Sequence, residues 1–337
     1  MSIGLDIGSK TIKIVELEKE GSGFRLNASG VVGYAGGVLS TIKDDKELLP
    51  LADVIRKLHK EVRAKSHEVS IALPESLVFT RTVKYPVLTD QEIDSAVKWE
   101  AEQYIPIPKE EAVIEHQIIE RNETGNKAGV IVLLIASPKA LVEKYLKLAQ
   151  MAGLTVVGVE TEVLALSRSL APAEGVVMLL DFGATSTDIA IVKNGSVRFS
   201  RSIPTAGEAF TRALAQGLGI EYQQAEAYKK TYGLSKDLEG KVKAALTPVF
   251  NLVADEVKKA IYFYQSEEKG DPPASIIVSG GTAGMPEAIS SLSSLLGLEI
   301  VVGNPFAKVS VSAQTLKSLE NYLSLYSVAV GLALRGD

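Results

Sequence analysis

Two stretches of the chain share one pattern, and this repeat limits the possible folds more than any other feature of the sequence. The first covers residues 4–15 and the second covers residues 180–192. Allowing one inserted residue, each reads as an apolar strand, an Asp-x-Gly turn with small hydroxyl residues, and a second apolar strand. The sequence therefore predicts two similar β-hairpins, each with a carboxylate, a glycine and hydroxyl groups at its turn.

The chemistry of such a turn suits a phosphate group. Glycine lets an anion approach backbone N–H groups closely, and the hydroxyls add further donors. A carboxylate at the end of a buried strand, such as Asp6 or Asp181, is costly unless it is paired or lies near a cation. Mg²⁺ beside a phosphate supplies that cation, usually through water. One such turn is commonly only structural, but two copies predict two facing turns that hold one nucleotide.

Composition limits the class of protein. The chain has 337 residues, which points to two domains or more, and 46% of them are hydrophobic, which is enough for folded cores. A net charge of −5 argues against nucleic acid as the main ligand. There are no cysteines, so disulfides, thiolate catalysis and cysteine-bound metals are excluded. The three histidines are scattered without the spacing of metal ligands.

No stretch of the sequence has the character of a membrane segment. An apolar strand begins almost at the first residue, without the charged and apolar regions of a secretory signal. The most apolar run, residues 130–136, is far too short to span a bilayer. We therefore expect a cytoplasmic protein without direct membrane insertion, which a partner holds at any membrane where it acts.

Apolar spacing along the first half predicts α/β organisation. A third strand is expected at residues 29–34, then a helix over about 45–65 with apolar residues at helical spacing, then a strand at 69–74. Thr89 and Glu92 form a capping box that predicts a helix start. A block of about seventy residues from that point to the strand at 154–160 is read as a small inserted unit, with its own strands and a helix ending at Met151.

The segment around Trp99 and residues 104–108 has two interpretations. It can be core packing followed by a proline helix stop, since each proline disfavours helix in the residue before it. It can also form a surface for a partner peptide, because aromatic residues and rigid prolines make contact surfaces of low entropy.

The second half contains three further motifs. A helix starting near Glu160 leads into the second hairpin, and residues 208–268 are largely helical. Within them Glu226 and Lys229 lie one helical turn apart, which suits either a solvated salt bridge or a ligand site. The strand at 275–279 ends in a glycine-rich loop before a helix from about Pro286, and such a junction exposes backbone N–H groups. Small residues at helical spacing over 326–335 predict a tightly packed core helix.

The order of these parts resembles the five-motif arrangement of the actin-like ATPase superfamily. Two families of that superfamily, FtsA and PilM, carry an inserted subdomain called 1C. Residues 98–108 closely resemble the motif that opens this subdomain in the PilM family of type IV pilus assembly proteins. FtsA normally continues beyond the small-residue helix into a membrane-targeting helix, so the end of the chain after Arg335 also favours PilM.

The resemblance implies an α/β fold with two domains, each built on a duplicated sheet-and-helix core. The expected divisions are 1–84, 154–174 and about 308–337 for subdomain 1A, 85–153 for 1C, 175–204 and 270–307 for 2A, and 205–269 for 2B.

The same resemblance implies that ATP and Mg²⁺ are the ligands. Asp6 and Asp181 would hold the Mg²⁺ shell, and Glu162 would join Asp181 in catalysis by orienting the attacking water, although Glu160 is close enough to compete. The residues implied to cradle the phosphates are Gly8, Ser9, Lys10, Gly183, Ala184 and Thr185. The residues implied along the ribose and nucleoside are Glu226, Lys229, Gly280, Gly281 and Thr282. Lys10 can instead simply face solvent.

The function implied by the resemblance is an ATP-binding scaffold with slow or no ATPase activity. Its partners would be the cytoplasmic N-terminal peptide of PilN and other proteins of the pilus inner-membrane platform. It would lie in the cytoplasm, peripheral at the inner membrane through a partner. Two alternatives share the fold: a filament-forming protein like FtsA, and a small-molecule kinase, although no polar cluster after Asp6 suits a sugar.

Overall fold

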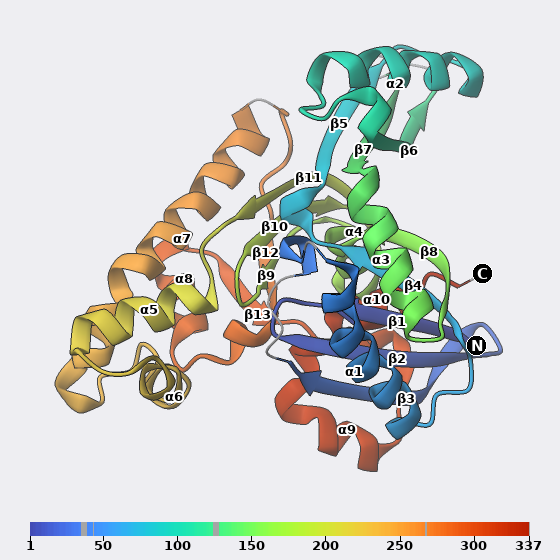
Figure 1. Cartoon of the computed structure of the whole chain (residues 1–337). Helices are drawn as coiled ribbons and strands as arrows, with labels where there is room; N and C mark the ends of the chain where they lie inside the picture. The colour runs from blue at the N-terminus through green and yellow to red at the C-terminus, as the bar shows by residue number, and fades with distance from the viewer. Residues whose placement is uncertain (35–38, 43, 124–127, 267, 337) are drawn as a thin grey trace.

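The described part of the chain forms three β-sheets with helices packed on them (Figure 1). The computed structural model describes residues 1–34, 39–42, 44–123, 128–266 and 268–336. No helix within these ranges is both long and apolar enough to cross a membrane.

The largest sheet has six strands and contains the first predicted hairpin. In spatial order its strands are β14 (Val309–Ser310), β3 (Gly23–Gly33), β2 (Thr11–Glu20), β1 (Ser2–Ile7), β4 (Glu68–Leu73) and β8 (Thr155–Thr161). Helices α1 (Leu48–Glu61) and α3 (Lys139–Met151) share one apolar core with this sheet. Helices α4 (Glu162–Leu170) and α10 (Ser327–Ala333) pack together on the other side of it (Figure 1).

The predicted small-residue helix is α10, and glycine allows it to pack closely. A Cβ atom on Gly331 would lie 1.9 Å from the carbonyl oxygen of Ala165 in α4. A Cβ atom on Gly4 of β1 would lie 1.9 Å from the carbonyl oxygen of Ala329. Glycine is therefore required on both sides of α10, because no real Cβ contact is that short.

The second sheet has five strands and contains the second predicted hairpin. In spatial order its strands are β11 (Ser196–Ile203), β10 (Thr187–Lys193), β9 (Val176–Phe182), β12 (Ser275–Ser279) and β13 (Glu299–Val302). The helices of this half are α5 (Gly207–Leu218), α6 (Tyr222–Tyr232), α7 (Lys241–Ser266) and α8 (Ala288–Leu296). Residues of this sheet and of all four helices form one apolar core.

The third sheet has three strands and stands apart from the other two as a small lobe (Figure 1). Its order is β5 (Phe79–Tyr85), β7 (Gly129–Pro138) and β6 (Ala112–Asn122), and α2 (Asp90–Tyr104) packs on it through Ile93 and Val97. The predicted capping box is confirmed, because Thr89 Oγ1 accepts from the N–H of Glu92, and Glu92 Oε2 accepts from the N–H of Thr89.

The remaining elements are short. They are helix α9 (Ala313–Leu319) and the 3₁₀ turns η1 (Leu39–Thr41), η2 (Asp45–Glu47), η3 (Glu75–Leu77), η4 (Lys109–Glu111), η5 (Leu238–Gly240), η6 (Gly281–Gly284), η7 (Pro305–Lys308) and η8 (Glu320–Tyr326).

Several boundaries differ from the sequence prediction. The third strand begins at Gly23, and the helix expected near Glu160 begins at Glu162, because Thr161 caps it by accepting from the N–H of Leu164. The glycine-rich loop leads into the short η6 turn, and α8 starts only at Ala288. These elements start at local turns and caps, whereas the prediction relied on apolar spacing.

The inserted unit also consists of different strands and helices from those expected. The three-stranded sheet already begins at Phe79, and α3 packs in the core of the six-stranded sheet through Leu141, Tyr145 and Leu148. These contacts connect distant segments, so spacing along the chain does not reveal them. The division into four subdomains stays a prediction.

The three-stranded lobe touches the second sheet through β11. Thr82 of β5 donates from Oγ1 to the carbonyl oxygen of Arg198, at 2.6 Å, and the Arg198 guanidinium forms a 2.5 Å ion pair with Glu120 of β6. Lys84 of β5 pairs with Glu268 beyond α7, at 2.9 Å. These contacts link the lobe to the second half of the chain.

Candidate functional site

The turns of the two predicted hairpins have the same backbone register. Asp6 pairs with Lys13 across β1 and β2, and Asp181 pairs with Asp188 across β9 and β10. The partner lies seven positions after the aspartate in both hairpins, so the one-residue insertion allowed in the sequence comparison is wrong. The insertion came from aligning the hydroxyl residues of the two turns. The strand register instead places the same number of residues between the paired positions in both hairpins.

A glycine closes each turn in the same way. The N–H of Gly8 donates to the carbonyl oxygen of Thr11 at 3.1 Å, and the N–H of Gly183 donates to that of Ser186 at 3.0 Å. A Cβ atom on Gly8 would lie 3.1 Å from the Thr11 oxygen, and one on Gly183 would lie 2.8 Å from the Ser186 oxygen. Close approach of two backbone segments therefore explains both glycines, without any need for a positive φ.

Each predicted metal-binding aspartate has a specific partner. Asp6 is buried and accepts from Lys13 Nζ at 3.0 Å. Asp181 accepts from Ser279 Oγ at 2.7 Å. Burial raises the pKa of Asp181, and the Ser279 hydrogen bond and the charge of Lys13 partly offset that rise. The influence of both Lys13 and Asp6 on Asp181 indicates that the ends of β1 and β9 lie near each other.

Further carboxyl groups lie beside these aspartates. Burial raises the pKa of Glu162 well above its usual range, and the charges of Asp188, Asp6 and Asp181 raise it further. Burial likewise raises the pKa of Asp188 to about 7. The Oδ1 atom of Asp188 is buried and has no hydrogen-bond partner among the described residues. The site thus gathers several carboxyl groups whose ionised forms a divalent cation would favour.

The fit to Mg²⁺ depends on how the carboxylates are spaced. Among the described residues, no group of three or more Asp, Glu or His side chains converges closely enough to bind a metal ion directly. Asp6 and Asp181 would therefore hold Mg²⁺ through bound water and phosphate oxygens, which is the usual arrangement for this ion.

The structure also distinguishes between the two glutamates proposed for catalysis. Glu160 at the end of β8 is held by Arg168, whose two terminal nitrogens contact its oxygens at 2.6 and 2.7 Å. Glu162 accepts only a backbone bond, from the N–H of Glu75 at 3.1 Å, among the hydrogen bonds of the described residues. Glu162 is therefore the glutamate available to the aspartate cluster.

Helices α5 and α6 bring several predicted residues to the second turn. The Lys229 ammonium is buried, pairs with Glu226 at 2.7 Å, and donates to the carbonyl oxygen of Gly207 at 2.9 Å. Thr211 Oγ1 donates to the same Glu226 carboxylate at 2.5 Å. Burial lowers the pKa of Lys229, and the contact with Glu226 opposes that fall. The Glu226–Lys229 pair is therefore held in place by α5 beside the second turn and is not a solvated surface salt bridge.

The glycine-rich loop lies against the same turn. Thr282 Oγ1 donates to the carbonyl oxygen of Gly183 at 3.0 Å. Gly280 has φ +85°, and a Cβ atom there would lie 2.4 Å from the carbonyl oxygen of Phe182, so only glycine fits. Gly281 follows it and packs against Leu325 of η8. The loop thus lies beside the second turn, and its contact with a nucleoside stays a prediction.

An ion pair connects the first turn to the second half. Lys10 Nζ lies 2.7 Å from Glu208 Oε1, and Glu208 is fixed because its N–H donates to the carbonyl oxygen of Ala184, at 2.8 Å. The hydrogen bond with Glu208 is the main reason that the pKa of Lys10 is raised. Lys10 therefore points to the opposite turn, and the alternative of a purely solvent-facing lysine does not describe its position. Ser9 and Thr185 lie half-exposed in their turns.

Several residues of this site do not appear in the sequence prediction. They are Lys13, Glu75, Asp188, Gly207, Glu208, Thr211 and Ser279. Lys13 and Asp188 had a usable signal, since each follows its aspartate by seven residues. The others reach the site from elements far away in the sequence, and only the fold brings them there.

Comparison with known proteins decides the family. The sequence matches the family described as type IV pilus assembly protein PilM over residues 4–337. The chain belongs to the PilM family. Its role is therefore in type IV pilus assembly, and its fold is that of the actin-like ATPases, which confirms both the predicted fold and the predicted relationship to FtsA.

Three known proteins illustrate the range of similarity to this chain. The structure of a PilM–PilN type IV pilus biogenesis complex is 27% identical, with a TM-score of 0.85, over 99% of this chain and 98% of that one. The cell division protein FtsA of Streptococcus pneumoniae serotype 2 (strain D39) is 24% identical over 88% of this chain and 74% of FtsA. MreB5 of Spiroplasma citri bound to AMPPNP shares the fold, with 15% identity and a TM-score of 0.51 over 98% of this chain and 93% of that chain.

Proposed function

We propose that this chain is an ATP-binding cytoplasmic scaffold of the type IV pilus inner-membrane platform. It holds Mg·ATP between its two domains and binds the cytoplasmic N-terminal peptide of PilN. That peptide keeps it at the inner membrane beside other platform proteins. The observation that carries the nucleotide part is the pair of turns with identical register, each with a carboxylate at its end.

The arrangement of donors supports a phosphate chain between the turns. Gly8 and Ser9 in one turn, and Ala184 and Thr185 in the other, are only partly covered, so a ligand can reach their backbone groups. Lys10 adds a cation at the same place. The Glu226–Lys229 pair and the Gly280 loop supply polar groups beyond the second turn, where a ribose would lie.

Hydrolysis is expected to be slow. A water-orienting residue works best as a general base when its carboxyl is ionised, but burial and neighbouring carboxylates raise the pKa of Glu162 well above its usual range. A bound divalent cation would favour ionisation of Glu162, yet positioning and Mg²⁺ would still carry most of the reaction. We therefore propose that binding, not turnover, is the output of this site.

The peptide part of the proposal rests on the three-stranded lobe. A cavity of about 400 Å³ lies at the end of α2, lined by Ala101, Glu102, Ile105, Pro106, Ile107, Pro108, Lys109 and Ile114. Trp99 is 61% exposed on the same helix, and Tyr104 lies beneath the Arg81 guanidinium at 3.8 Å. The proline-rich segment is therefore not only a helix stop, since it forms a shaped surface with exposed aromatic residues.

Thermal unfolding of the full chain with Mg·ATP tests the nucleotide part. We expect ATP to raise the melting temperature, because a ligand that binds only the folded state stabilises it by about 2.7 kcal/mol at 100 times its dissociation constant. Asp6→Asn should lose most of this shift while keeping the shape of the side chain. Asp255→Asn, on the exposed face of α7, is the matched control. An unchanged shift in Asp6→Asn would remove Asp6 from the site.

Fluorescence anisotropy with a labelled N-terminal PilN peptide tests the partner part. Trp99→Ala should weaken binding by about tenfold, the usual effect of removing an aromatic anchor. Leu49→Ala on α1 removes another exposed apolar side chain elsewhere and should leave peptide binding unchanged. No peptide binding with or without Mg·ATP would contradict the proposal.

A further inference from the structure

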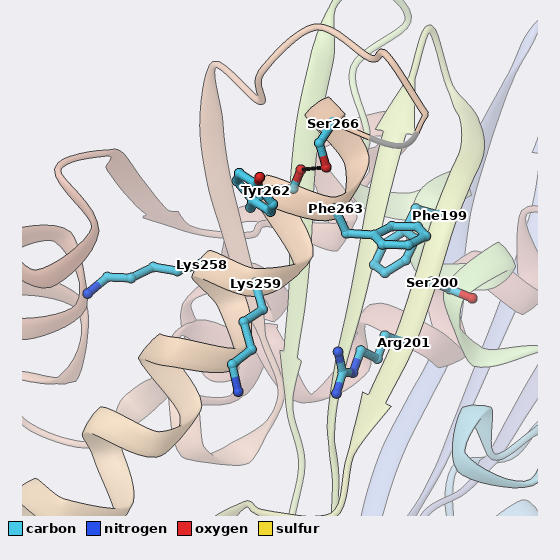
Figure 2. Close-up of a pocket in the computed structure, with 8 residues that line it drawn as sticks. All are labelled: Phe199, Ser200, Arg201, Lys258, Lys259, Tyr262, Phe263 and Ser266. Atoms are coloured by element: carbon cyan, nitrogen blue, oxygen red, sulfur yellow. Dashed lines mark hydrogen bonds between the residues drawn. The ribbon is translucent and has the colours of Figure 1, made fainter.

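A second cavity lies on the opposite half of the molecule, between β11 and the C-terminal part of α7 (Figure 2). Its volume is about 550 Å³, and it is lined by Phe199, Ser200, Arg201, Lys258, Lys259, Tyr262, Phe263 and Ser266. We call this surface the β11–α7 pocket. β11 is the edge strand of the five-stranded sheet. Neither the nucleotide site nor the surface at Trp99 includes any of these residues.

Aromatic side chains form the apolar part of the pocket. Tyr262 is 73% exposed and Phe263 is 44% exposed, while the Phe199 ring lies 5.4 Å from that of Phe263 (Figure 2). The core needs none of this exposed surface, because α7 already buries Val257 and Ala260 against the sheet on its other side. Clustered exposed aromatics with a cavity between them are typical of a binding surface.

Cationic side chains surround those aromatics. Lys258 and Tyr262 lie four residues apart on α7, as do Lys259 and Phe263, so each lysine shares a helix face with one ring. Arg201 extends toward the same space from β11 (Figure 2). Among the described residues, the pocket thus has three cationic lining residues and no acidic one, on a chain whose net charge is −5.

One carboxylate beneath the pocket forms ion pairs with two of these cations, and its single negative charge neutralises only one of their two positive charges. Glu256 lies 2.7 Å from Arg201 and 2.8 Å from Lys259, and its side chain is only 16% exposed. Lys258 is held more loosely, at 3.7 Å from Asp255. Two cations that share one buried carboxylate keep a net positive charge, so a carboxylate from a ligand would complete the cluster.

We propose that the β11–α7 pocket binds an acidic segment of a partner protein through one aromatic or branched apolar side chain and flanking carboxylates. The apolar side chain packs on the paired Phe199 and Phe263 rings and against Tyr262. The carboxylates contact Lys259 and Arg201, with Lys258 at the rim. The pocket lies apart from the peptide surface at Trp99, so it gives the scaffold a second docking point.

Selection of displayed random peptides on the full chain tests the proposal. We expect enriched peptides to combine an aromatic or branched apolar residue with several Asp or Glu residues. Synthetic versions should bind about tenfold more weakly to Lys259→Glu and to Tyr262→Ala, as expected for hot-spot residues. Both side chains are exposed, so these variants should fold. Lys241→Glu and Leu252→Ala alter other exposed positions of α7 outside the pocket and should leave binding unchanged.

Three results would overturn the proposal. The first is a selection without acidic, apolar-anchored peptides, or with peptides whose binding ignores both pocket variants. The second is displacement of the selected peptides by the N-terminal PilN peptide, which would make the pocket part of the PilN site. The third is self-association in sedimentation that is lost in both Lys259→Glu and Trp99→Ala. That loss would identify a second copy of the chain, through the acidic α2, as the occupant.

Discussion

Glu75 lies in η3, at the point where the chain leaves the six-stranded sheet for the three-stranded lobe, and its carboxyl group is buried. Burial raises its pKa to about 7, although the nearby hydroxyl groups of Ser200, Thr161 and Thr80 partly oppose this rise. Oε2 has no hydrogen-bond partner among the described residues. The charged groups around it are acidic, since its backbone N–H contacts Glu162 and its charge acts on Asp188. Among the described residues, no cation contributes to the shift of its pKa.

This environment predicts how stability depends on pH. The Glu75 carboxyl keeps its proton up to about pH 7 in the folded chain, but in the unfolded chain it ionises near 4.5. The folded state therefore binds more protons in that window, and stability falls as pH rises through it. Glu75→Gln cannot ionise, so at pH 8 it should be more stable than the wild type by about 1 to 3 kcal/mol, with little difference at pH 4.

Urea unfolding of the chain without nucleotide at several pH values measures this difference. Glu61→Gln on α1, where the carboxylate is 60% exposed, is the control and should run parallel to the wild type. A Glu75→Gln variant that is less stable than the wild type at pH 8 would mean that the ionised Glu75 carboxylate stabilises the folded state at that pH.

Sequence reasoning at the residue scale found the groups that the repeat itself contains. Asp6, Asp181 and the turn glycines are visible because they recur. Glu75 and Ser279 are not, because a single buried glutamate or serine has no pattern along the chain. Their importance comes from which distant group each one meets, Glu162 for Glu75 and Asp181 for Ser279.

The elements that were predicted best are those whose burial shows in their periodicity. Strands β1, β2, β9 and β10 and helix α1 follow apolar spacing closely. The assignment of α3 to the inserted unit came from its position in the sequence, but its apolar face belongs to the core of the first sheet. Which core an amphipathic helix joins is decided by topology, and spacing gives only the existence of the apolar face.

The packing of α10 against β1 and α4 leads to a prediction about that element. Gly331→Ala would place a Cβ atom 1.9 Å from the Ala165 carbonyl oxygen, on backbone that cannot rotate away. Helix propensity favours alanine by about 1 kcal/mol, but overpacking of a core costs about 1 to 3 kcal/mol or more. We expect a net loss of about 2 kcal/mol in the free energy of unfolding, measured by urea denaturation.

Gly284→Ala is the matched control for this substitution. A Cβ atom there would have no heavy atom within 4 Å, and no positive φ restricts the position. Its stability should stay within about 0.5 kcal/mol of the wild type, as for surface substitutions in general. Equal stability of the two alanine variants would show that α10 can move away from α4 at little cost.

At the scale of the whole molecule, contacts on two sides of the fold join the two halves. The three-stranded lobe touches β11 through Thr82 and the Arg198–Glu120 pair, and the Lys10–Glu208 ion pair links the two hairpin turns. The first contact includes a buried arginine, whereas Lys10 is 52% exposed. Exposed ion pairs contribute only about 0.2 to 1 kcal/mol, so the second contact is the one that a ligand can replace.

Glu208 and a nucleotide phosphate would compete for Lys10. Under the proposed function, Lys10 has to leave Glu208 before it contacts phosphate, and the lost ion pair lowers the apparent affinity for ATP. Glu208→Gln removes that competition and one negative charge near the phosphates, so we expect ATP to bind about 2 to 5 times more tightly, the equivalent of about 0.4 to 1 kcal/mol. Isothermal titration with Mg·ATP measures the change in affinity, and the gain should be smaller at high salt.

Glu239→Gln is the control, because it frees an exposed lysine of the same half, Lys241, and this variant should bind ATP like the wild type. Weaker binding by Glu208→Gln would instead assign the ion pair to the closed form that holds the nucleotide.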